Sequence, residues 1–476
     1  MDYSYHLLAE NLRKQIDAKT YLPGDRLPSV RDLATGHGYS LETVLHALRI
    51  LENNGLVEPR LRSGFYVRQP KLQQVAPPSK SQTVFRAKDV DLSSLRHQTV
   101  AFGTSKNVVP LGLSLLNSEV LPTRQLAQTL AGIARRYPVE VSSQAAVGGI
   151  ESLRQQLAQR AGAWGCFLSP DDFVITCGAS EALYLALRAV SQPGDIVLVE
   201  SPCYFGTLEV IENLGLRVVE LATDPEEGID LFELENVLKR FRRVAACLLV
   251  TNYSNPLGYT LSTKSKRSLV QILSRFGVPL IEDDIFGELH RPEVERPRVA
   301  KSFDENGSII LVGSFSKTLA PGLRIGWIVP GKFRDRVLQL KSATNFATPS
   351  LPQLACAEFL KFGSFDAHLR RLRRFLADEV YRFSSAIAER FPASTRISRP
   401  SGGFLLWVEL EPGFDALEFA ASALNRYRIA IVPGNLFSAT GERYRNCFRI
   451  SCGHAFSPRF AEAIQTLGRL ATRSVH

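Results

Sequence analysis

The sequence predicts a multidomain chain: a small winged helix-turn-helix domain at the N-terminus, a large α/β domain after it, and a smaller α+β part at the C-terminus. Three observations predict this order. Residues 1–68 show helical periodicity and then a short ribbon, residues 69–107 are polar and proline-rich, and from residue 108 strand and helix patterns alternate. A length of 476 residues fits two to four domains at roughly 100–200 residues each.

The N-terminal 68 residues carry the signals of three helices. Apolar residues recur at helical spacing from Tyr5 to Ile16. Ser29 precedes a second, short apolar pattern and Ser40 a third, and serine is a preferred residue at the N-cap of a helix because its hydroxyl accepts a backbone N–H. We therefore expect a short second helix after Ser29 and a longer third helix after Ser40.

A two-stranded ribbon is expected after the third helix. Residues 56–58 and 65–67 are apolar and flank a turn that contains Gly64. Three helices followed by a hairpin are typical of a winged helix-turn-helix, whose third helix enters the major groove of DNA N-terminus first.

The next segment, residues 69–107, is predicted to be a linker. It contains Pro77-Pro78, Ser79-Lys80-Ser81 and several glutamines, and it has little periodicity. Such a composition favours an extended or flexible chain.

Seven candidate strands follow the linker, and helical patterns separate several of them. This alternation is typical of a largely parallel sheet with helices on both faces. The strands are expected at residues 173–176, 196–200, 216–221, 245–250, 278–282, 309–312 and 325–329.

The pattern changes near residue 350, which divides the domain of 108–476 into a large part (about 108–348) and a small part (about 349–476). A long basic helix is expected at 367–391. Strands are expected after it at 404–409, 429–432 and 447–451.

Composition excludes several classes of protein. With 45% hydrophobic residues the chain is not mostly disordered. The longest apolar run, residues 244–250, is far below the ~20 residues of a membrane span. The seven scattered cysteines contain no Cys-x-x-Cys pair, and the first residues lack a secretory pattern. We therefore expect a soluble protein of the reducing cytoplasm, without a metal site.

The net charge of +10 does not identify a DNA-binding domain by itself. Residues 1–70 hold nine Lys and Arg against eight Asp and Glu, a net of +1, and residues 71–110 hold six against two, a net of +4. The excess outside the N-terminal domain indicates either further contact with the DNA backbone or an ordinary solvated surface, and both interpretations stay open.

Six residues are candidate DNA contacts. They lie before the turn, on the outer side of the third helix or in the ribbon turn, where a base edge or a phosphate is within reach. Without DNA, they would be solvated residues of a small bundle. The six are Arg31, Ser40, Thr43, His46, Arg49 and Gly64.

The spacing of Pro23–Ala34, Ser40–Val44 and Ser63–Val67 resembles the GntR family of bacterial regulators over nearly all of the 68 residues. Many members carry arginines beside and after the cap of the third helix, where this chain has Leu41 and Leu45. Guanine reading by arginine is therefore not expected at these two places. Specificity would rest on Arg31, on His46, on DNA shape or on two half-sites read by a dimer.

Four separated motifs in the large domain suggest one ligand. Thr176–Ala182 runs from a strand into a helix, whose first N–H groups can bind an anion. Asn252–Gly258 supplies a buried asparagine, or only a turn. Ile281–Asp284 ends an apolar strand with carboxylates. These can bind a protonated ring nitrogen, bind a metal ion or cap a helix.

The fourth motif, Gly313–Gly326, is the most specific. Lys317 follows a strand end between hydroxyl residues, and Arg324 lies seven residues further on. A desolvated lysine can form a Schiff base with an aldehyde, and hydroxyls with an arginine can hold a phosphate. The motifs fall at the same ends of parallel strands, where open α/β sheets bind ligands.

Together these motifs resemble the fold-type-I aminotransferases, which use pyridoxal 5′-phosphate (PLP), from about residue 108 to 470. By this resemblance Lys317 would form the Schiff base, Asp283 would pair with the ring nitrogen, and Asn255 would bond the ring 3′-oxygen. Tyr204 would stack on the ring, and Arg449 would clamp a substrate carboxylate. The phosphate would be held by Ala179, Ser180, Ser314, Ser316 and Arg324.

One departure from that family concerns the ring oxygen. Its members usually place a tyrosine just after the aspartate pair, where this chain has Ile285-Phe286. One fewer donor to the phenolate should raise the imine pKa and weaken transamination.

The fusion of the two parts resembles the MocR branch of the GntR regulators over nearly the whole chain. The resemblance implies a homodimeric transcription factor that binds operator DNA and PLP, and whose body senses PLP or an amino compound. The alternatives are an active PLP-dependent aminotransferase that also binds DNA, and a DNA-binding protein with a relic body that binds no cofactor.

Overall fold

The computed structural model describes residues 4–18, 20–21, 24–54, 56–60, 63–68, 75–83, 85–91, 107–362 and 364–473. The chain separates into two compact units, residues 1–74 and 75–476. We call them the head and the body. Each has its own apolar core.

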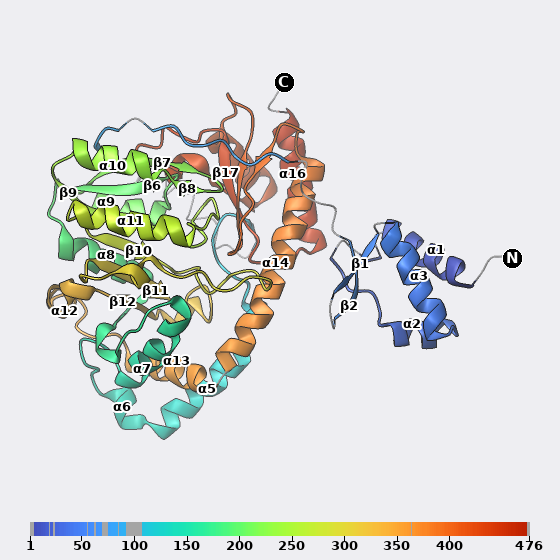
Figure 1. The fold of residues 1–476 in the computed structure, drawn as a ribbon, viewed down its shortest axis with the longest axis horizontal. Helices are drawn as coiled ribbons and strands as arrows, with labels where there is room; N and C mark the ends of the chain where they lie inside the picture. Colours follow the sequence, from blue (N-terminus) through green and yellow to red (C-terminus); the bar gives the residue numbers. More distant parts are fainter. Residues whose placement is uncertain are drawn as a thin grey trace. The chain divides into compact units, whose positions relative to one another are not determined.

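The head contains the predicted three helices and hairpin (Figure 1). Its apolar core comes from all three helices and both strands, and includes Leu8, Leu33, Leu48, Val57 and Val67. The elements are α1 (Ser4–Asp17), α2 (Val30–His37), α3 (Leu41–Asn53), β1 (Val57–Arg60) and β2 (Gly64–Val67), with the two strands antiparallel.

The two predicted helix caps are confirmed. The Ser29 hydroxyl accepts the N–H of Asp32 at 3.2 Å while the Asp32 carboxylate accepts the N–H of Ser29, a reciprocal capping box. The Ser40 hydroxyl accepts the N–H of Thr43 at 3.1 Å. Caps of this kind stabilise a helix by about 1 kcal/mol.

Residues 75–83 and 85–91 pack on the body, which differs from the predicted linker of 69–107. Ser79 donates its N–H and hydroxyl to Glu409, and β3 (Lys88–Asp89) joins the large sheet antiparallel to its neighbour, as the edge strand. The polar, proline-rich segment is extended as expected, and the sheet edge and a carboxylate accept its donors. Residues 69–74 and 92–106 of the predicted linker lie outside the described residues.

The body is built on a nine-stranded sheet in the order β3-β7-β6-β9-β10-β11-β12-β5, with β8 paired to β7. The strands from β7 to β11 run parallel, while β12 is antiparallel to both neighbours. A largely parallel sheet is thus confirmed. The bounds are β5 (Val174–Thr176), β6 (Ile196–Ser201), β7 (Arg217–Asp224), β8 (Gly228–Ile229), β9 (Val244–Leu249), β10 (Leu280–Asp283), β11 (Ile309–Ser314) and β12 (Gly326–Val329).

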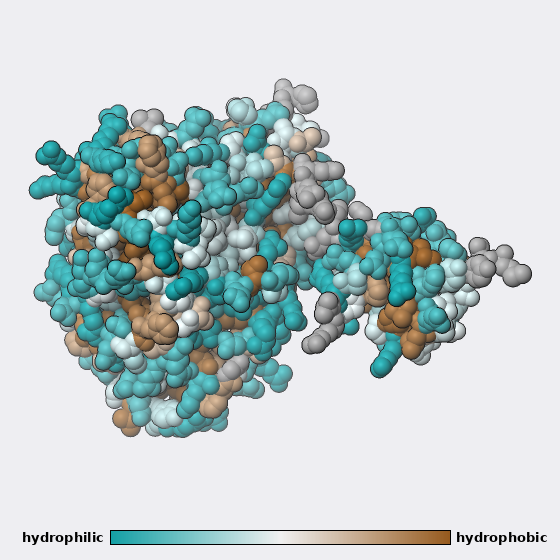
Figure 2. Space-filling model, in the orientation of Figure 1, coloured by the Kyte–Doolittle hydropathy of each residue, from teal (hydrophilic) through white to brown (hydrophobic). Residues whose placement is uncertain are grey.

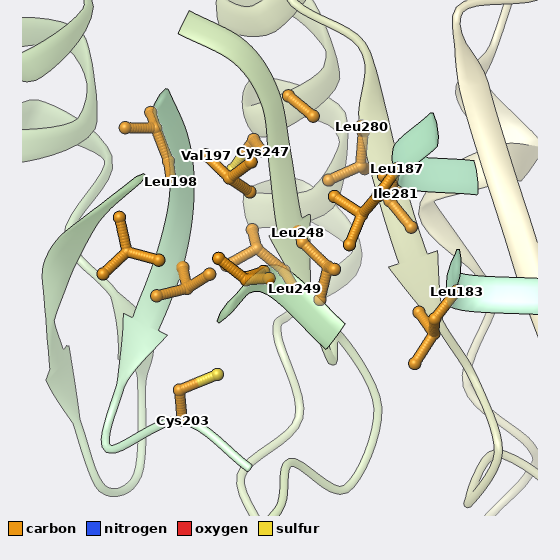
Figure 3. Close-up of a cluster of buried hydrophobic side chains, with 14 of the residues drawn as sticks. Leu183, Leu187, Val197, Leu198, Cys203, Cys247, Leu248, Leu249, Leu280 and Ile281 are labelled. Atoms are coloured by element: carbon orange, nitrogen blue, oxygen red, sulfur yellow. The ribbon is translucent and has the colours of Figure 1, made fainter. Parts of the chain in front are cut away.

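Helices cover this sheet and bury its apolar side chains. Leu183 and Leu187 of one helix lie beside Leu248 and Ile281 of the strands (Figure 3). The helices are α5 (Thr123–Arg136), α6 (Pro138–Ser142), α7 (Glu151–Ala161), α8 (Gly178–Val190), α9 (Phe205–Asn213), α10 (Leu231–Arg240), α11 (Thr263–Arg275), α12 (Arg334–Ser342) and α13 (Ser350–Lys361).

The C-terminal part is the predicted smaller α+β structure. Its antiparallel sheet has the order β13-β14-β17-β16. The predicted strand at 429–432 is two short strands, and the first of them pairs with β4 (Val109–Pro110). The elements are α14 (Ser364–Arg390), β13 (Arg396–Ile397), β14 (Leu405–Glu409), α15 (Ala416–Tyr427), β15 (Ile429–Ala430), β16 (Val432–Pro433), β17 (Cys447–Ser451) and α16 (Pro458–Arg473).

All seven cysteines are free, and all except Cys177 are buried. Among the helices that the structure describes, none has both the length and the apolar character that crossing a membrane requires.

Candidate functional site

Lys317 lies just after β11, at the edge where the parallel strands end. Its Nζ donates to the carbonyl oxygen of Ser114 at 2.5 Å and lies 3.3 Å from the Ser114 hydroxyl. Burial and the nearby charge of Arg449 lower the pKa of Lys317 to about 8, against the opposing charge of Asp283. A neutral amine, which is the form that attacks an aldehyde, is therefore accessible near neutral pH.

Asp283 ends β10, beside β11. It is 2% exposed and accepts the N–H of Ile285 at 3.2 Å. Burial raises the pKa of Asp283 to about 7, and the neighbouring Asp284 adds to the rise, while the Ile285 N–H and Lys317 oppose it. A buried carboxyl of this kind gains most from a cationic partner, such as a protonated ring nitrogen.

An anion cradle forms where the start of α8 meets the turn after β11. Arg324 spans the two, with Nη1 3.4 Å from the Ser316 hydroxyl and Nη2 3.5 Å from the Cys177 carbonyl oxygen. The Ser314 and Ser316 hydroxyls lie 2.9 Å apart. A guanidinium, two hydroxyls and the N-terminus of a 13-residue helix are donors suited to a phosphate.

Glycine is required at the start of α8. Gly178 has a φ of +79°, and a Cβ there would lie 2.3 Å from Nη2 of Arg324. Ala179 and Ser180 follow in the first turn of the helix, and Ser180 is exposed. The backbone thus approaches the Arg324 guanidinium more closely than a residue with a Cβ would allow.

Arg449 on β17 is fully buried at the other side of this site. Its Nη1 donates to the Asn255 side-chain oxygen at 2.9 Å, and its Nη2 donates to the Gly112 carbonyl at 2.7 Å. The rings of Phe205 and Phe437 lie 5.5 Å and 5.1 Å from its guanidinium. Burial lowers the pKa of Arg449 to about 10, so it stays charged at neutral pH.

The guanidinium of Arg449 has capacity left for a ligand. Its Nε–H is buried and has no hydrogen-bond partner among the described residues. An unpaired buried donor on a cation is costly unless a ligand satisfies it, and a carboxylate is the group that an arginine binds in bidentate fashion.

Tyr204 directly precedes α9 and is partly buried. A Cβ at Gly206 would lie 2.5 Å from Cε1 of Tyr204, so the ring takes its position because residue 206 has no side chain. The Tyr204 ring lies 4.7 Å from the Phe205 ring, which in turn lies 5.5 Å from the Arg449 guanidinium.

These residues fit the cofactor that the sequence resemblance implies. A phosphate suits the cradle that Gly178 opens, an aldehyde suits the amine of Lys317, and a ring nitrogen suits Asp283. The unpaired Nε–H of Arg449 suits the carboxylate of an amino compound. The ten residues predicted for the ligand come from segments far apart in the chain. Nine of them lie at or near the ends of strands of the large sheet, and Arg449 lies within β17 of the C-terminal sheet.

The Ile285-Phe286 departure has a structural counterpart. Phe286 is 1% exposed and packs edge-on against Phe404, at 5.8 Å between ring centroids, in the core of the C-terminal part. Position 286 therefore contributes to packing.

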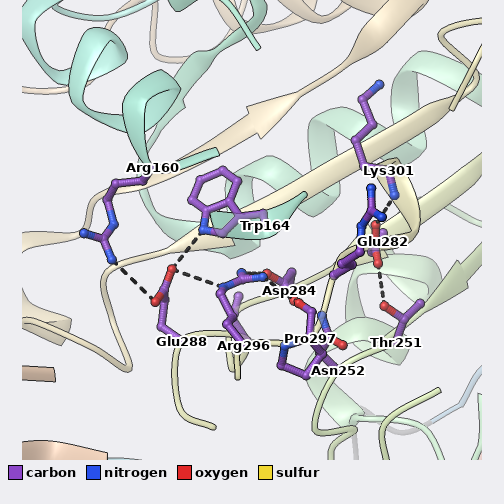
Figure 4. Close-up of polar contacts among 12 residues, drawn as sticks. Arg160, Trp164, Thr251, Asn252, Glu282, Asp284, Glu288, Arg296, Pro297 and Lys301 are labelled. Atoms are coloured by element: carbon purple, nitrogen blue, oxygen red, sulfur yellow. Dashed lines mark hydrogen bonds and ion pairs between the residues drawn. The ribbon is translucent and has the colours of Figure 1, made fainter. Parts of the chain in front are cut away.

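The carboxylate of Asp284 is part of an ion-pair network, in which its partner is Arg296 (Figure 4). It accepts from Arg296 and from Asn252. Glu288 accepts from Arg296 at 3.2 Å and from Trp164 at 2.9 Å. In the part of the chain that the structure describes, no cluster of three His, Cys, Asp or Glu residues is suited to a metal.

The arginines of this network also act on Glu288. Arg160 and Arg373 lie 3.5 Å and 3.1 Å from its carboxylate. Although burial opposes it, the charges of Arg296, Arg160 and Arg373 hold the pKa of Glu288 at about 2. The network ties the turn after β10 to α7 and α14, and so holds the strand end that carries Asp283.

Several of these contributors were missed by sequence reasoning. Ser114 and Gly112 contribute carbonyl oxygens, which no residue pattern reveals. Glu288 follows the aspartate pair by a few residues, yet a single acidic residue in a loop carries no signal. Gly206 follows the predicted Tyr204 by two residues, and this spacing is the one signal that was available.

The candidate DNA contacts lie on the surface of the head. Arg31, His46 and Arg49 are exposed. His46 also packs against the Tyr5 ring of α1, at 4.3 Å between centroids, which the sequence did not suggest. Gly64 has a φ of +106° in the wing.

Ser40 and Thr43 are partly committed to the cap of α3. The Ser40 hydroxyl accepts the Thr43 N–H and lies 2.8 Å from the Thr43 hydroxyl. Their free lone pairs and the exposed start of α3 remain open to a phosphate.

Comparison with known proteins agrees with this division. Residues 140–464 match the family described as aminotransferase class I and II, and residues 4–67 match the bacterial regulatory proteins of the gntR family. The chain is 39% identical to YdcR of Escherichia coli K12, named as an uncharacterised HTH-type transcriptional regulator, over 98% of both chains. It is 36% identical to a second regulator of that description, YjiR, over 99% of both.

The body also resembles solved aminotransferases. The crystal structure of LysN, an α-aminoadipate aminotransferase of Thermus thermophilus complexed with N-(5′-phosphopyridoxyl)-L-leucine, covers 81% of this chain and 99% of its own. The TM-score is 0.73 and the sequence identity 28%.

Proposed function

The chain belongs to the aminotransferase class I and II family, joined to a GntR-type head as in the MocR-type regulators, and we propose that it is a transcription factor whose body senses PLP or an amino compound bound with it. The head binds operator DNA, and ligand binding in the body changes that binding.

The anion cradle, the low pKa of Lys317 and the unpaired Nε–H of Arg449 carry this proposal. PLP, when bound, supplies an aldehyde that condenses with amines and a ring that withdraws electrons. Lys317 would bind at the aldehyde carbon, Asp283 would hold the proton of the ring nitrogen, and Asn255 would donate to the ring 3′-oxygen. Tyr204 would stack on the ring. The phosphate would be held by Ala179, Ser180, Ser314, Ser316 and Arg324.

Arg449 gives the body its means of discriminating ligands. A carboxylate satisfies its buried Nε–H, whereas an amine without a carboxylate leaves that donor unpaired. The effector class that fits best is therefore an amino compound with a carboxylate. Binding in the body and binding by the head are two distinct sites, which is the condition for allosteric coupling.

A homodimer in the cytoplasm is part of the proposal. Aminotransferase-type bodies commonly pair, and two heads per particle would read two half-sites. Sedimentation of the full chain at several concentrations tests the assembly.

The test is operator affinity. Genomic fragments bound by the full chain are identified, and the Kd of one fragment is measured for apo protein, for PLP-loaded protein and for loaded protein with each of a panel of amino acids. We expect a change in Kd of at least several-fold with PLP or with one amino acid. An unchanged Kd across the panel contradicts the sensing role.

An active aminotransferase is the second candidate, because both Lys317 and Arg449 are present at the site. Rapid multiple turnover with an amino acid and a keto-acid acceptor would favour it. The absence of a hydroxyl at 285–286 argues for slow turnover. A relic body that binds no cofactor is excluded if the visible band of bound PLP appears in the native chain and is lost in Lys317→Ala.

A further inference from the structure

Two leucines are exposed on the helix that is expected to read DNA. Leu41 and Leu45 of α3 are 50% and 38% exposed. They are four residues apart and so lie one above the other on a single face of the helix. The adjacent face of the helix packs into the core of the head, through Val44, Leu48 and other residues, so that Leu41 and Leu45 flank the buried side chains. Figure 2 shows hydrophobic surface on the head among mostly hydrophilic residues.

The next residue along this face of α3 is a cation. Arg49 follows Leu45 by four residues and is exposed. This face therefore presents two apolar side chains at the start of α3 and a guanidinium one turn later. In a helix-turn-helix the N-terminal residues of the recognition helix contact base edges, while cations bind the phosphates alongside.

Leucine has no hydrogen-bonding group, so it cannot read the donors and acceptors of a base. The one apolar group in the major groove is the C5-methyl of thymine. We propose that Leu41 and Leu45 read thymine C5-methyl groups, so that each half-site distinguishes thymine at two positions. This inference rests on the proposed function, since it requires that the head binds DNA.

A protein partner fits the leucine pair less well. Two side chains expose far less than the roughly 800 Å² per partner that a stable protein interface buries. The pair also lies between the Ser40 cap and Arg49, a position in which a base edge and a phosphate are neighbours.

The experiment uses the full chain loaded with PLP and a random duplex library. Selection yields a preferred duplex, and each dT in it is then replaced singly by dU, which lacks only the methyl group. Fluorescence anisotropy at one fixed salt concentration gives each Kd. Loss of one buried methyl contact is expected to weaken binding about fourfold.

Leu41→Ala and Leu45→Ala assign the positions. We expect each variant to lose its sensitivity to dU at one position of the half-site and to keep it at the other. Leu7→Ala is the matched control, because Leu7 is a leucine of the head that is 53% exposed on α1. Since all three side chains are exposed, the variants should keep their melting temperature.

The outcomes separate the two claims. If the chain selects no duplex at all, both the proposed function and this inference are wrong. If it selects a duplex and the Kd is the same with dU at every position, the inference is wrong, while the proposed function as a DNA-binding regulator is unaffected. If Leu41→Ala changes the oligomeric state and leaves the dU sensitivity unchanged, the leucines contact protein, which also overturns the inference.

Discussion

The body and the head hold their candidate contacts in opposite ways. In the body, Arg449 is fully buried and bonded to groups 194 and 337 residues away in the chain. In the head, Arg31 and Arg49 are exposed, and the nearby polar contacts at Ser29 and Ser40 are caps that span three residues. The body is organised before its ligand arrives. The exposed side chains of the head contribute binding free energy only when DNA binds and displaces the water around them.

Removing the Lys317 amine should have the largest effect, a complete loss of covalently bound PLP from the body. Lys317→Ala loses the amine that binds the aldehyde, so we expect no visible band of bound PLP after dialysis. The absorption spectrum measures this. Lys332→Ala, at an exposed lysine, should keep the band. Persistence of the band in Lys317→Ala would assign the amine to another residue.

Removing the Glu288 charge should destabilise the body but not the head. The pKa of Glu288 is held at about 2, below its ordinary 4.5, so the ionised form stabilises the fold. That difference corresponds to about 3 kcal/mol at neutral pH. Glu288→Gln should lose this in urea unfolding of the body.

The pH dependence of the Glu288 effect follows from the sign of the shift. A lowered carboxyl pKa contributes stability above pH 4.5, and the contribution is lost as the pH falls from 4.5 toward 2. The difference between native chain and Glu288→Gln should therefore be constant above about pH 5.5, within ~0.3 kcal/mol, and shrink below pH 4.5. Glu305→Gln, at an exposed position, should cost less than ~0.5 kcal/mol. If both variants lost the same free energy of unfolding, the ion-pair network around Glu288 would not account for the stability of the body.

The pH dependence of the rate of PLP incorporation should report the pKa of Lys317. With a pKa of about 8, only about one tenth of Lys317 is neutral at pH 7. The rate for apo protein, followed by the growth of the visible band, should therefore rise about tenfold between pH 7 and a plateau above about pH 9. Arg449→Gln removes a neighbouring positive charge and should move the midpoint upward. A rate that still rises at about pH 10 would mean an ordinary lysine.

Removing a cap should have the smallest effect, and only in the head. Ser40→Ala deletes the hydroxyl that accepts the Thr43 N–H, at a cost of about 1 kcal/mol to the head. Amide hydrogen exchange in α3 of the full chain should speed up about fivefold, with the PLP band unchanged. Ser63→Ala in the wing is a matched serine control outside the helix. Equal exchange in α3 for both variants would contradict a stabilising cap.

The contrast also explains what the sequence predicted. The parallel strands of the body were predicted within a few residues because a strand buried on both faces is a continuous apolar run. The head was predicted from caps and turns, which are local. The packing of 75–83 and 85–91 was not, since β3 is polar and has no apolar run to signal a strand.

Within the site, the same limit applies. Lys317 and Arg324 were found because their motif is local. Gly112, Ser114 and Glu288 were not, since their roles depend on which distant groups the fold brings near them. The packing of His46 on Tyr5 is also a tertiary contact that helical spacing does not show.

Coupling between body and head is tested most directly from the body. Apo protein is titrated with PLP, followed by the visible band, with and without a saturating operator duplex. Linkage requires that DNA changes PLP affinity by the same factor as PLP changes DNA affinity. We predict a factor of at least about fivefold, equal in both directions. Identical PLP affinity with and without the operator would mean that the body does not control the head.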